Sequence, residues 1–402
     1  MNQGLCLKLL LLNLTLQSGI AENWTQFRGQ NGTGVSKEWN LTEHPVTGRD
    51  IAWKIDLPGR GLSSPIIIEN RAFVTCSSGI HQDRLHVICY NIEKGEEIWH
   101  RQFWATGRTM TQQKTCVAAS TPTSDGSRIF ALFSSNDLIC LDLNGNLKWL
   151  RGLTVDYPNA GNSLGMAASP IIAENTLIIQ TEADSESLAL GIDPETGLNL
   201  WKRERPRNAN WTSPLTLKTT GGSSIIALQS SRGIEAIHPK TGKVVWSYDD
   251  GAATIPSSAS NGEILFVPSH GITALKIQPG ADSFTQIWRK RQFNPGTASP
   301  IAIANRIYTV NNAGVLTCGD SDNGERLWQL RLKGPFTASP VGGRNHLYFV
   351  NEKGLLQVVN ISAPEGKLVA HYDFKDTILA TPSIAGNALF IRSDRSLWKI
   401  TE

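Results

Sequence analysis

One short phrase recurs along this chain: a Gly, three further residues, then a Trp. Seven Trp residues follow one another at intervals of 40 to 52 residues, and five of them end this phrase. A period of this length is typical of repeat architectures, in which each unit buries its apolar face against its neighbours. The phrase therefore predicts a series of equal units instead of one continuous core. The seven positions are Trp53, Trp99, Trp149, Trp201, Trp246, Trp288 and Trp328.

Each unit has the pattern of four short strands. It begins at a residue before Pro, and Pro suits the first position of a strand because it has no N–H to donate. Apolar segments follow, and a turn rich in Asp, Asn, Thr and Gly leads into the Trp strand. Four antiparallel strands in each repeat are the anatomy of a propeller blade. The eight openings are Ser64-Pro65, Thr121-Pro122, Ser169-Pro170, Ser213-Pro214, Ile255-Pro256, Ser299-Pro300, Ser339-Pro340 and Thr381-Pro382.

The two ends of the chain complete one unit together. The last unit stops at Glu402 after its third strand, and the segment around Trp53 has the pattern of a fourth strand. The sequence therefore predicts an all-β fold, an eight-bladed β-propeller of four-stranded antiparallel blades, closed by the N-terminal strand around Trp53. Closure removes the open edges of a linear array. In unit seven, Ala370 stands where a Trp is expected, which predicts a weaker contact between blades there.

The first residues have the pattern of an export signal. Lys8 precedes an apolar run from Leu9 to Leu16, and small residues stand before a cleavage point at Glu22. The run is too short to span a bilayer. We expect a signal peptide over 1–21, an N-terminal extension over 22–50 and the propeller over 51–402. The protein is then exported, either periplasmic or secreted, with no transmembrane segment.

Charge and cysteine content limit the function further. The net charge of +3 argues against nucleic acid as a partner, and we expect a monomer. Cys89, Cys140 and Cys318 occupy one small-residue position of the repeat, which predicts buried apolar fillers. Cys76 lies on the strand next to Cys89, so a disulfide between these two stays open at this point. Cys116 lies in a loop and is a candidate free thiol.

The repeat also resembles a known family. The phrase small-x-Asp/Asn-x-x-Thr-Gly-Lys-x-x-Trp, clearest over 191–201 and 236–246, is similar to the repeat of pyrroloquinoline quinone (PQQ) enzymes. The segment 24–36 is similar to the start of many bacterial secreted PQQ-like propellers. Over 24–402 the chain therefore resembles the PQQ-like, BamB-like β-propeller family of the bacterial secreted type. This resemblance implies that each Trp packs on the turn of the neighbouring blade.

The resemblance implies two kinds of function. Family members that are dehydrogenases hold PQQ with Ca²⁺ beneath a disulfide of adjacent Cys, and this sequence has no adjacent Cys pair. No residue is carried over as catalytic or as a metal ligand, and no cofactor is expected. We expect a non-catalytic binding or scaffolding protein of the bacterial cell envelope, in a role such as outer-membrane assembly. The alternatives are a PQQ-dependent alcohol or sugar oxidoreductase and a sugar-binding propeller.

The loops that lead from each fourth strand to the next opening should emerge together at one axial end of the ring. Propeller ligands commonly lie at such a concave surface, so we expect envelope proteins, a small ligand or a sugar to bind there. Asn offers a donor and an acceptor and Trp offers a ring face, although either is also common in ordinary loops. The long insert 104–119 is a second candidate region. The candidate residues are Arg60, Lys114, Asn162, Asn208, Asn210, Trp211 and Asn294.

Overall fold

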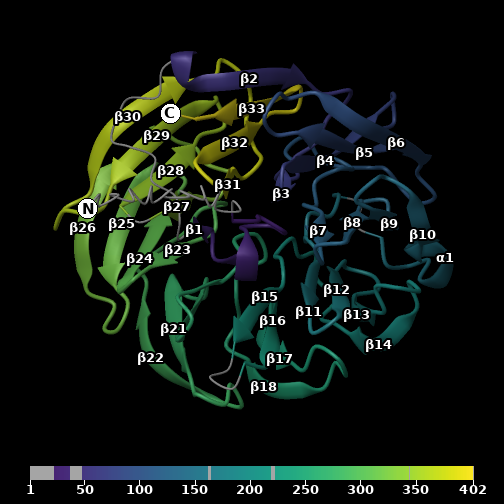
Figure 1. Cartoon of the computed structure of the whole chain (residues 1–402). Helices are drawn as coiled ribbons and strands as arrows, with labels where there is room; N and C mark the ends of the chain where they lie inside the picture. The colour runs from purple at the N-terminus through teal and green to yellow at the C-terminus, as the bar shows by residue number, and fades with distance from the viewer. Residues whose placement is uncertain (1–21, 37–47, 162–163, 219–221, 344, 402) are drawn as a thin grey trace, which may run out of the picture.

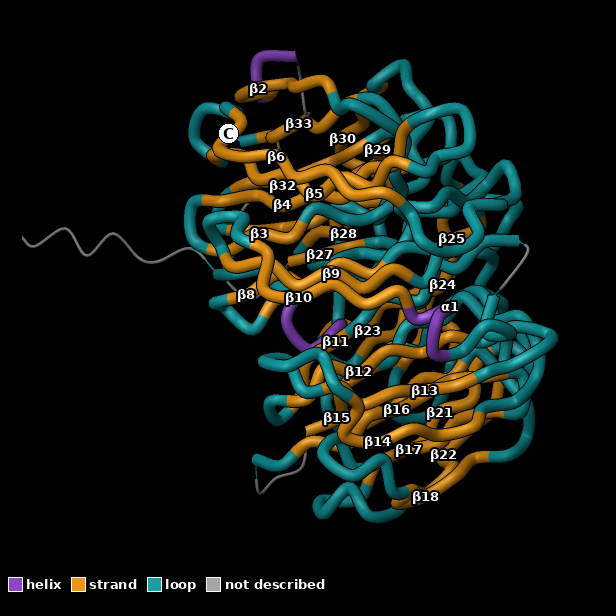
Figure 2. Tube along the Cα trace, turned by 90° about the vertical axis from the view of Figure 1, so that its right-hand side faces the viewer, coloured by secondary structure: helices purple, strands orange, loops and turns teal. Residues whose placement is uncertain are grey.

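The computed structural model describes residues 22–36, 48–161, 164–218, 222–343 and 345–401. The predicted export signal, residues 1–21, lies outside the described residues. Eight sheets stand around a central axis, and each contains four antiparallel strands, which are consecutive along the chain in every blade but the last (Figure 1). In the side view of Figure 2 the strands run across the middle and the loops gather at both axial ends. The prediction of an eight-bladed propeller is confirmed.

The first four blades follow one another along the chain without interruption. They contain β3 (Ile66–Ile68), β4 (Arg71–Ser78), β5 (Arg84–Asn91) and β6 (Glu97–Trp104) in blade 1; β7 (Thr123–Ser124), β8 (Arg128–Leu132), β9 (Asp137–Asp142) and β10 (Leu147–Gly152) in blade 2; β11 (Ile171–Ala173), β12 (Thr176–Thr181), β13 (Leu188–Ile192) and β14 (Asn199–Glu204) in blade 3; and β15 (Leu215–Lys218), β16 (Ser224–Ser230), β17 (Gly233–Ile237) and β18 (Val244–Tyr248) in blade 4.

The remaining blades repeat this order. They contain β19 (Ala259–Ser260), β20 (Ile264–Val267), β21 (Ile272–Ile277) and β22 (Phe284–Lys290) in blade 5; β23 (Ile301–Ile303), β24 (Arg306–Val310), β25 (Val315–Asp320) and β26 (Arg326–Arg331) in blade 6; β27 (Val341–Gly343), β28 (His346–Val350), β29 (Leu355–Asn360) and β30 (Lys367–Asp373) in blade 7; and β31 (Ser383–Ala385), β32 (Ala388–Arg392), β33 (Ser396–Ile400) and β2 (Ile51–Asp56) in blade 8.

Blade 8 joins the two ends of the chain, as predicted. Strand β2 pairs antiparallel with β33, and Trp53 lies opposite Lys399. A further N-terminal strand, β1 (Val35–Ser36), pairs in parallel with β27 on the axial side of blade 7. The helical elements are short: α1 (Leu153–Asp156) and the 3₁₀ turns Gln30–Gly32 and Gly48–Asp50.

Each repeat Trp packs on the third-to-fourth-strand turn of the next blade. A β-bulge lies beside the Trp in the outer strand, for example between Gly191 and Ile192 opposite Trp201. A bulge bends its strand and re-aims a side chain, which here directs the indole out of its own sheet. Six indole N–H groups donate to turn carbonyls at 2.7–3.1 Å. The acceptors are the carbonyls of Ile92, Leu143, Pro194, Pro239, Ala281 and Ser321.

The turn Gly is required because the indole leaves no room for a side chain. Gly242 has φ +65°, and a Cβ added there would lie 2.6 Å from the ring of Trp201. Gly197 has φ +72°, and a Cβ there would lie 2.8 Å from Trp149. The Gly of each phrase therefore contacts the Trp of the preceding unit and not the Trp of its own phrase.

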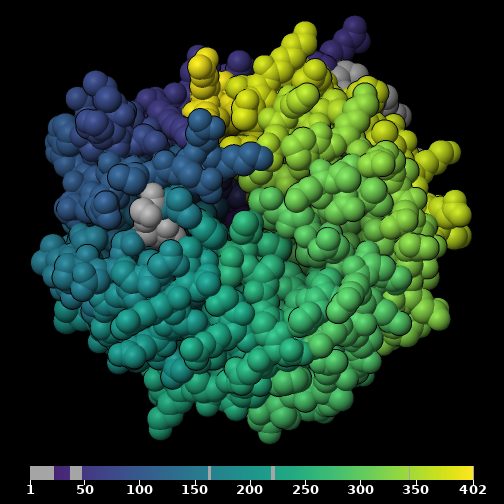
Figure 3. All heavy atoms as spheres, turned by 180° about the vertical axis from the view of Figure 1, so that it is seen from behind, coloured from purple at the N-terminus to yellow at the C-terminus, as the bar shows by residue number. Residues whose placement is uncertain are grey.

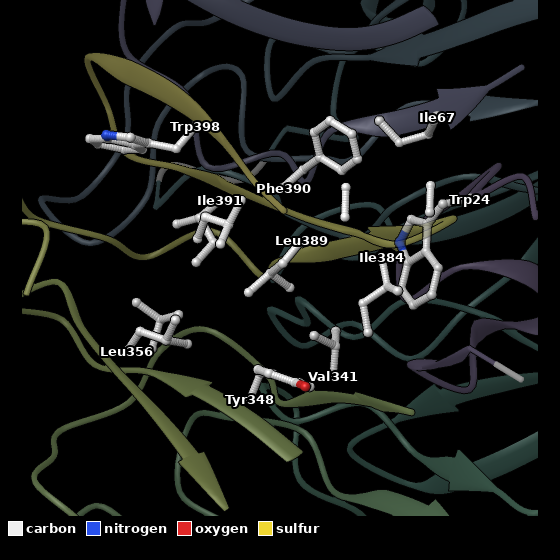
Figure 4. Close-up of a cluster of buried hydrophobic side chains, with 14 of the residues drawn as sticks. Trp24, Ile67, Val341, Tyr348, Leu356, Ile384, Leu389, Phe390, Ile391 and Trp398 are labelled. Carbon is white, nitrogen blue, oxygen red and sulfur yellow. The ribbon is translucent and has the colours of Figure 1, made fainter. Parts of the chain in front are cut away.

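The junction of blades 7 and 8 is packed without a repeat Trp. Blade 8 has no hairpin turn between its third and fourth strands, because β33 and β2 are far apart in sequence, so an indole at Ala370 would have no turn carbonyl to reach. Phe374 packs instead against Trp398, with ring centroids 5.0 Å apart. Both blades share a large buried cluster that also holds Trp24 near Ile384 (Figure 4). These residues fill the junction where the repeat Trp is missing at Ala370, and a weaker contact there stays a prediction.

The cysteines from Cys76 onwards, which the structure describes, are buried free thiols. Cys89, Cys140 and Cys318 each lie directly opposite the Trp of their own blade, where Gly191 and Ala236 stand in blades 3 and 4. This register confirms their role as small fillers beneath the indole. Cys76 pairs in register with His86, three residues from Cys89, so the two thiols project from opposite faces of the sheet and form no disulfide.

We predict that Gly242→Ala lowers the melting temperature clearly more than Gly262→Ala. Both positions have positive φ, but a Cβ at Gly262 meets nothing within 4 Å, whereas one at Gly242 strikes Trp201. The clash should add about 1–3 kcal/mol to the backbone cost that both variants share. Thermal unfolding followed by circular dichroism measures the difference. Equal melting temperatures would show that indole packing on the turn does not support the ring.

Candidate functional site

A belt of hydroxyl groups runs around the central axis. The hydroxyl oxygen that opens each blade accepts the backbone N–H of the equivalent residue in the preceding blade, at 2.9–3.1 Å. These hydrogen bonds link all eight blades in sequence, except that none joins Thr381 to Ser64 among the described residues. We call this belt the girdle; its members are Ser64, Thr121, Ser169, Ser213, Ser257, Ser299, Ser339 and Thr381.

The girdle corrects one predicted blade opening. In blade 5 the sequence pattern selected Ile255-Pro256, but the girdle hydroxyl belongs to Ser257, and Ser258 takes the place that Pro has in the other blades. The Pro in this blade stands two residues early. The sequence pattern was misleading because Pro suits the start of a first strand at position 256 as well as at position 258. Only the hydrogen bond to the adjacent blade identifies Ser257 as the equivalent residue.

The girdle surrounds an axial cavity of about 230 Å³. Residues from the loops before all eight blades line it, which confirms that these loops converge at one axial end. Seven girdle members form its wall, and apolar side chains lie around them. Figure 3 shows this face of the molecule. The apolar lining residues are Phe27, Leu62, Ala119, Ala167, Trp211, Ile255 and Leu379.

The N-terminal segment closes the other end of the channel. Trp24 is buried and forms a bridge with Ile67 of blade 1, while β1 adds to blade 7, so the segment crosses the axis (Figure 1). Phe27 lies at the base of the cavity. The segment 24–36, which resembles the start of other secreted propellers, therefore acts as a plug that turns the channel into a bowl.

Two fully buried guanidinium groups lie within one residue of the girdle. Arg28 donates to the carbonyls of Ser258 and Pro300, and Arg392 donates to the carbonyl and hydroxyl of Ser63. Burial lowers the pKa of Arg28 to about 10. Neither group forms an ion pair within the described parts of the chain. Both therefore add positive potential around the channel.

The long insert 105–119 reaches across the mouth of the cavity. Gln112, Lys114 and Thr115 line the cavity, and Lys114 Nζ pairs with Glu352 of blade 7 at 2.8 Å. Figure 3 shows blue atoms of this region extending towards the yellow-green blade. Arg60 supports the insert, because its guanidinium donates to the carbonyl of Gln113. Lys114 is 60% exposed, so this ion pair contributes little stability, and the insert is held mainly by its buried residues 115–119.

The structure distributes the predicted site residues unevenly. Lys114 and Trp211 line the cavity, and the Trp211 indole donates to the carbonyl of Gly165 at 2.7 Å. Arg60 lies behind the insert, in an ion pair with Asp394. These three are brought together at the axial end.

The three predicted Asn residues that the structure describes do not join them. Asn210 is buried and donates to Glu182 and to the carbonyl of Gln229, which makes it part of the packing. Asn208 is exposed, and Asn294 lines a separate surface pocket formed by loops of blades 4 and 5. Asn162 lies outside the described residues. Sequence reasoning missed the girdle hydroxyls and Phe27, although the repeated Ser or Thr before Pro was the available signal.

The cavity does not fit a calcium-bound quinone. Ca²⁺ takes about six to eight oxygen ligands, most often with carboxylates among them. Within the described ranges no group of three or more His, Cys, Asp and Glu side chains gathers, and Lys114 is the charged residue of the lining. The lining supplies hydroxyl donors and apolar surface, which suit binding. Among the described lining residues it supplies neither a carboxylate base nor a metal-ligand set.

The repeat, the indole docked on each neighbouring turn and the axial bowl define a β-propeller of the PQQ-repeat class. The sequence matches the family described as outer membrane protein assembly factor BamB over residues 45–164, 86–329, 270–362 and 312–402. Because these overlapping segments cover most of the chain, the protein belongs to this family. No curated protein matches the sequence.

Solved structures share the fold at low sequence identity. BamB from Moraxella catarrhalis aligns with a TM-score of 0.64 and 17% identity, over 88% of this chain and 97% of that one. A europium-containing methanol dehydrogenase aligns with a TM-score of 0.69 and 11% identity, over 95% and 98%. The quinohemoprotein alcohol dehydrogenase from Comamonas testosteroni aligns with a TM-score of 0.70 and 12% identity, over 94% and 80%. No described helix is long and apolar enough to span a bilayer.

We predict that Ser299→Ala loosens the junction of blades 5 and 6, whereas Ser299→Thr does not. The alanine leaves the buried N–H of Ser257 without its 3.0 Å acceptor, which costs about 1–3 kcal/mol. Thr already occupies the girdle at Thr121 and Thr381. Amide hydrogen exchange should accelerate at Ser257 in the alanine variant alone. Unchanged exchange at this amide would argue that the girdle bond is not needed.

Proposed function

We propose that this protein is a non-catalytic binding or scaffolding propeller of the bacterial cell envelope, acting in outer-membrane assembly in the manner of its BamB family. The axial bowl carries this proposal. Its lining combines hydroxyl donors with apolar side chains such as Leu62 and Trp211, and its one lining charge, Lys114, is paired with Glu352. Such a surface holds a ligand without transforming it.

Export is part of the same proposal. The family assignment points to the envelope, and the pattern of Lys8, the apolar run 9–16 and the small residues before Glu22 is that of a signal peptide. The plug begins almost directly after this point, with Trp24 buried in blade 1. Cleavage before Glu22 would leave the plug intact in the exported protein.

An oxidoreductase is the second candidate, because two of the similar folds belong to dehydrogenases. Those alignments have 11% and 12% identity, and they support a shared scaffold. The donor set of the bowl argues for the binding role, since a PQQ site requires an oxygen ligand set for its metal.

The binding role predicts that the bowl contacts envelope proteins in cells. A photocrosslinking residue at Gln112, which lines the cavity, should capture defined outer-membrane assembly proteins, identified by mass spectrometry. Capture should fall at least fivefold with Trp211→Ala and persist with Trp104→Ala. Trp104 is the matched control because it is 61% exposed on β6, outside the cavity lining.

The oxidoreductase role makes an opposite prediction. After incubation with PQQ and Ca²⁺, a quinone absorbance that survives desalting together with dye-linked alcohol oxidation would contradict a non-catalytic protein. Equal crosslinking in both Trp variants would show that partners bind elsewhere on the ring.

A further inference from the structure

The girdle hydroxyls have protons left to donate. Each oxygen of the seven members that line the cavity accepts a backbone N–H, and this orients its own O–H away from that bond. Within the described parts of the chain, no acceptor takes any of these seven protons. All seven side chains are buried, with exposed fractions of 2–7%. The cavity wall therefore presents a belt of hydroxyl donors, and a bound molecule can supply their acceptors.

The charge around the belt favours an anion. Arg28 and Arg392 are fully buried, and their guanidinium groups contact the main chain beside girdle members of blades 5, 6 and 1. Arg28 donates to carbonyls, and Arg392 donates to carbonyls, to the Ser63 hydroxyl and to the Cys76 thiol. These partners are uncharged and leave the positive charge in place. Lys114 at the mouth is already paired with Glu352, and among the described lining residues there is no carboxylate. An acidic ligand therefore gains mainly from the two buried guanidinium charges, which solvent does not screen.

The other lining residues favour a ligand with an apolar part. Trp211, Ile255, Leu62 and Leu379 lie on the wall and Phe27 lies at the base. The volume of about 230 Å³ is below the usual range for drug-sized ligands, which begins near about 300 Å³. The occupant is therefore a small molecule or a short group, with an acidic end and an apolar end.

We propose that the axial bowl binds a small amphipathic organic anion. Its carboxylate or phosphate accepts hydrogen bonds from the girdle hydroxyls, and its apolar body packs against Trp211 and the neighbouring aliphatic side chains. The insert 105–119 covers it, and Lys114 of this insert pairs with Glu352. This inference rests on the proposed function in one respect: both place the ligand in the bowl.

Titration calorimetry with the purified protein tests the ligand class. The probes are 3-phenylpropionate and its uncharged amide, which share one apolar body. We expect the acid to bind at least tenfold more tightly than the amide, and its affinity to fall as salt is raised. Equal affinity of acid and amide, or no binding of either at millimolar concentration, would overturn the inference.

Girdle variants locate the site. Thr381→Val removes one lining hydroxyl at almost constant volume, and Thr381→Ser keeps it. The valine variant should bind the acid about tenfold more weakly, and the serine variant should match the original protein. Thermal melting confirms that both variants are folded. Wild-type affinity in the valine variant would place the acid away from the girdle.

The outcomes separate this inference from the proposed function. Absent acid binding with intact crosslinking from Gln112 would overturn the anion and leave the scaffolding role. Acid binding with no captured envelope protein would do the reverse.

Discussion

The structure depends on hydrogen bonds that pass from one blade to the next around the axis. Each girdle hydroxyl except that of Ser64 accepts an N–H from the preceding blade, so neighbouring sheets are joined by a short polar bond where they converge most closely. At the outer rim each indole makes the matching contact with the following blade. The hydrogen bond to the girdle hydroxyl satisfies a backbone N–H that faces the channel and has no neighbouring strand to pair with. Together the two contacts explain why one polar and one aromatic residue recur in units that otherwise vary.

The girdle hydrogen bond and the indole contact are each missing once around blade 8, where the ring closes, within the described chain. No girdle bond joins Thr381 to Ser64 in the described chain, and Ser383 donates instead to the carbonyl of Pro65 at 2.5 Å. Ala370 stands in place of the indole of blade 7, where no hairpin turn joins β33 to β2 in blade 8. Aromatic packing through Phe374 and Trp398, the added strand β2 and the buried Trp24 hold this junction. The N-terminal segment therefore completes the ring and also supplies the floor of the bowl.

The fold could be predicted almost entirely, because the recurring Gly and Trp mark the packing of an indole on the turn of the next blade. This contact recurs around the ring, so its period gives the size of the repeating unit. Blade number, the closing strand at Trp53 and the filler position of Cys89, Cys140 and Cys318 all follow from that period. The site could be predicted only in part. Trp211 and Lys114 were found because they lie in loops, but Asn210 serves packing and the girdle was overlooked. A Ser or Thr before Pro looks like a strand start in sequence, and its second role appears only when the hydroxyl residues of all the blades face one axis.

The central claim is that the girdle-lined bowl is the ligand site of this propeller. A crystal structure of the protein soaked with a bromine-labelled phenylpropionate tests it most directly. The account predicts an anomalous bromine peak beside Trp211, with carboxylate oxygens within hydrogen-bond distance of at least two girdle hydroxyls. Bromine peaks confined to the outer strands, with only water along the girdle, would contradict it.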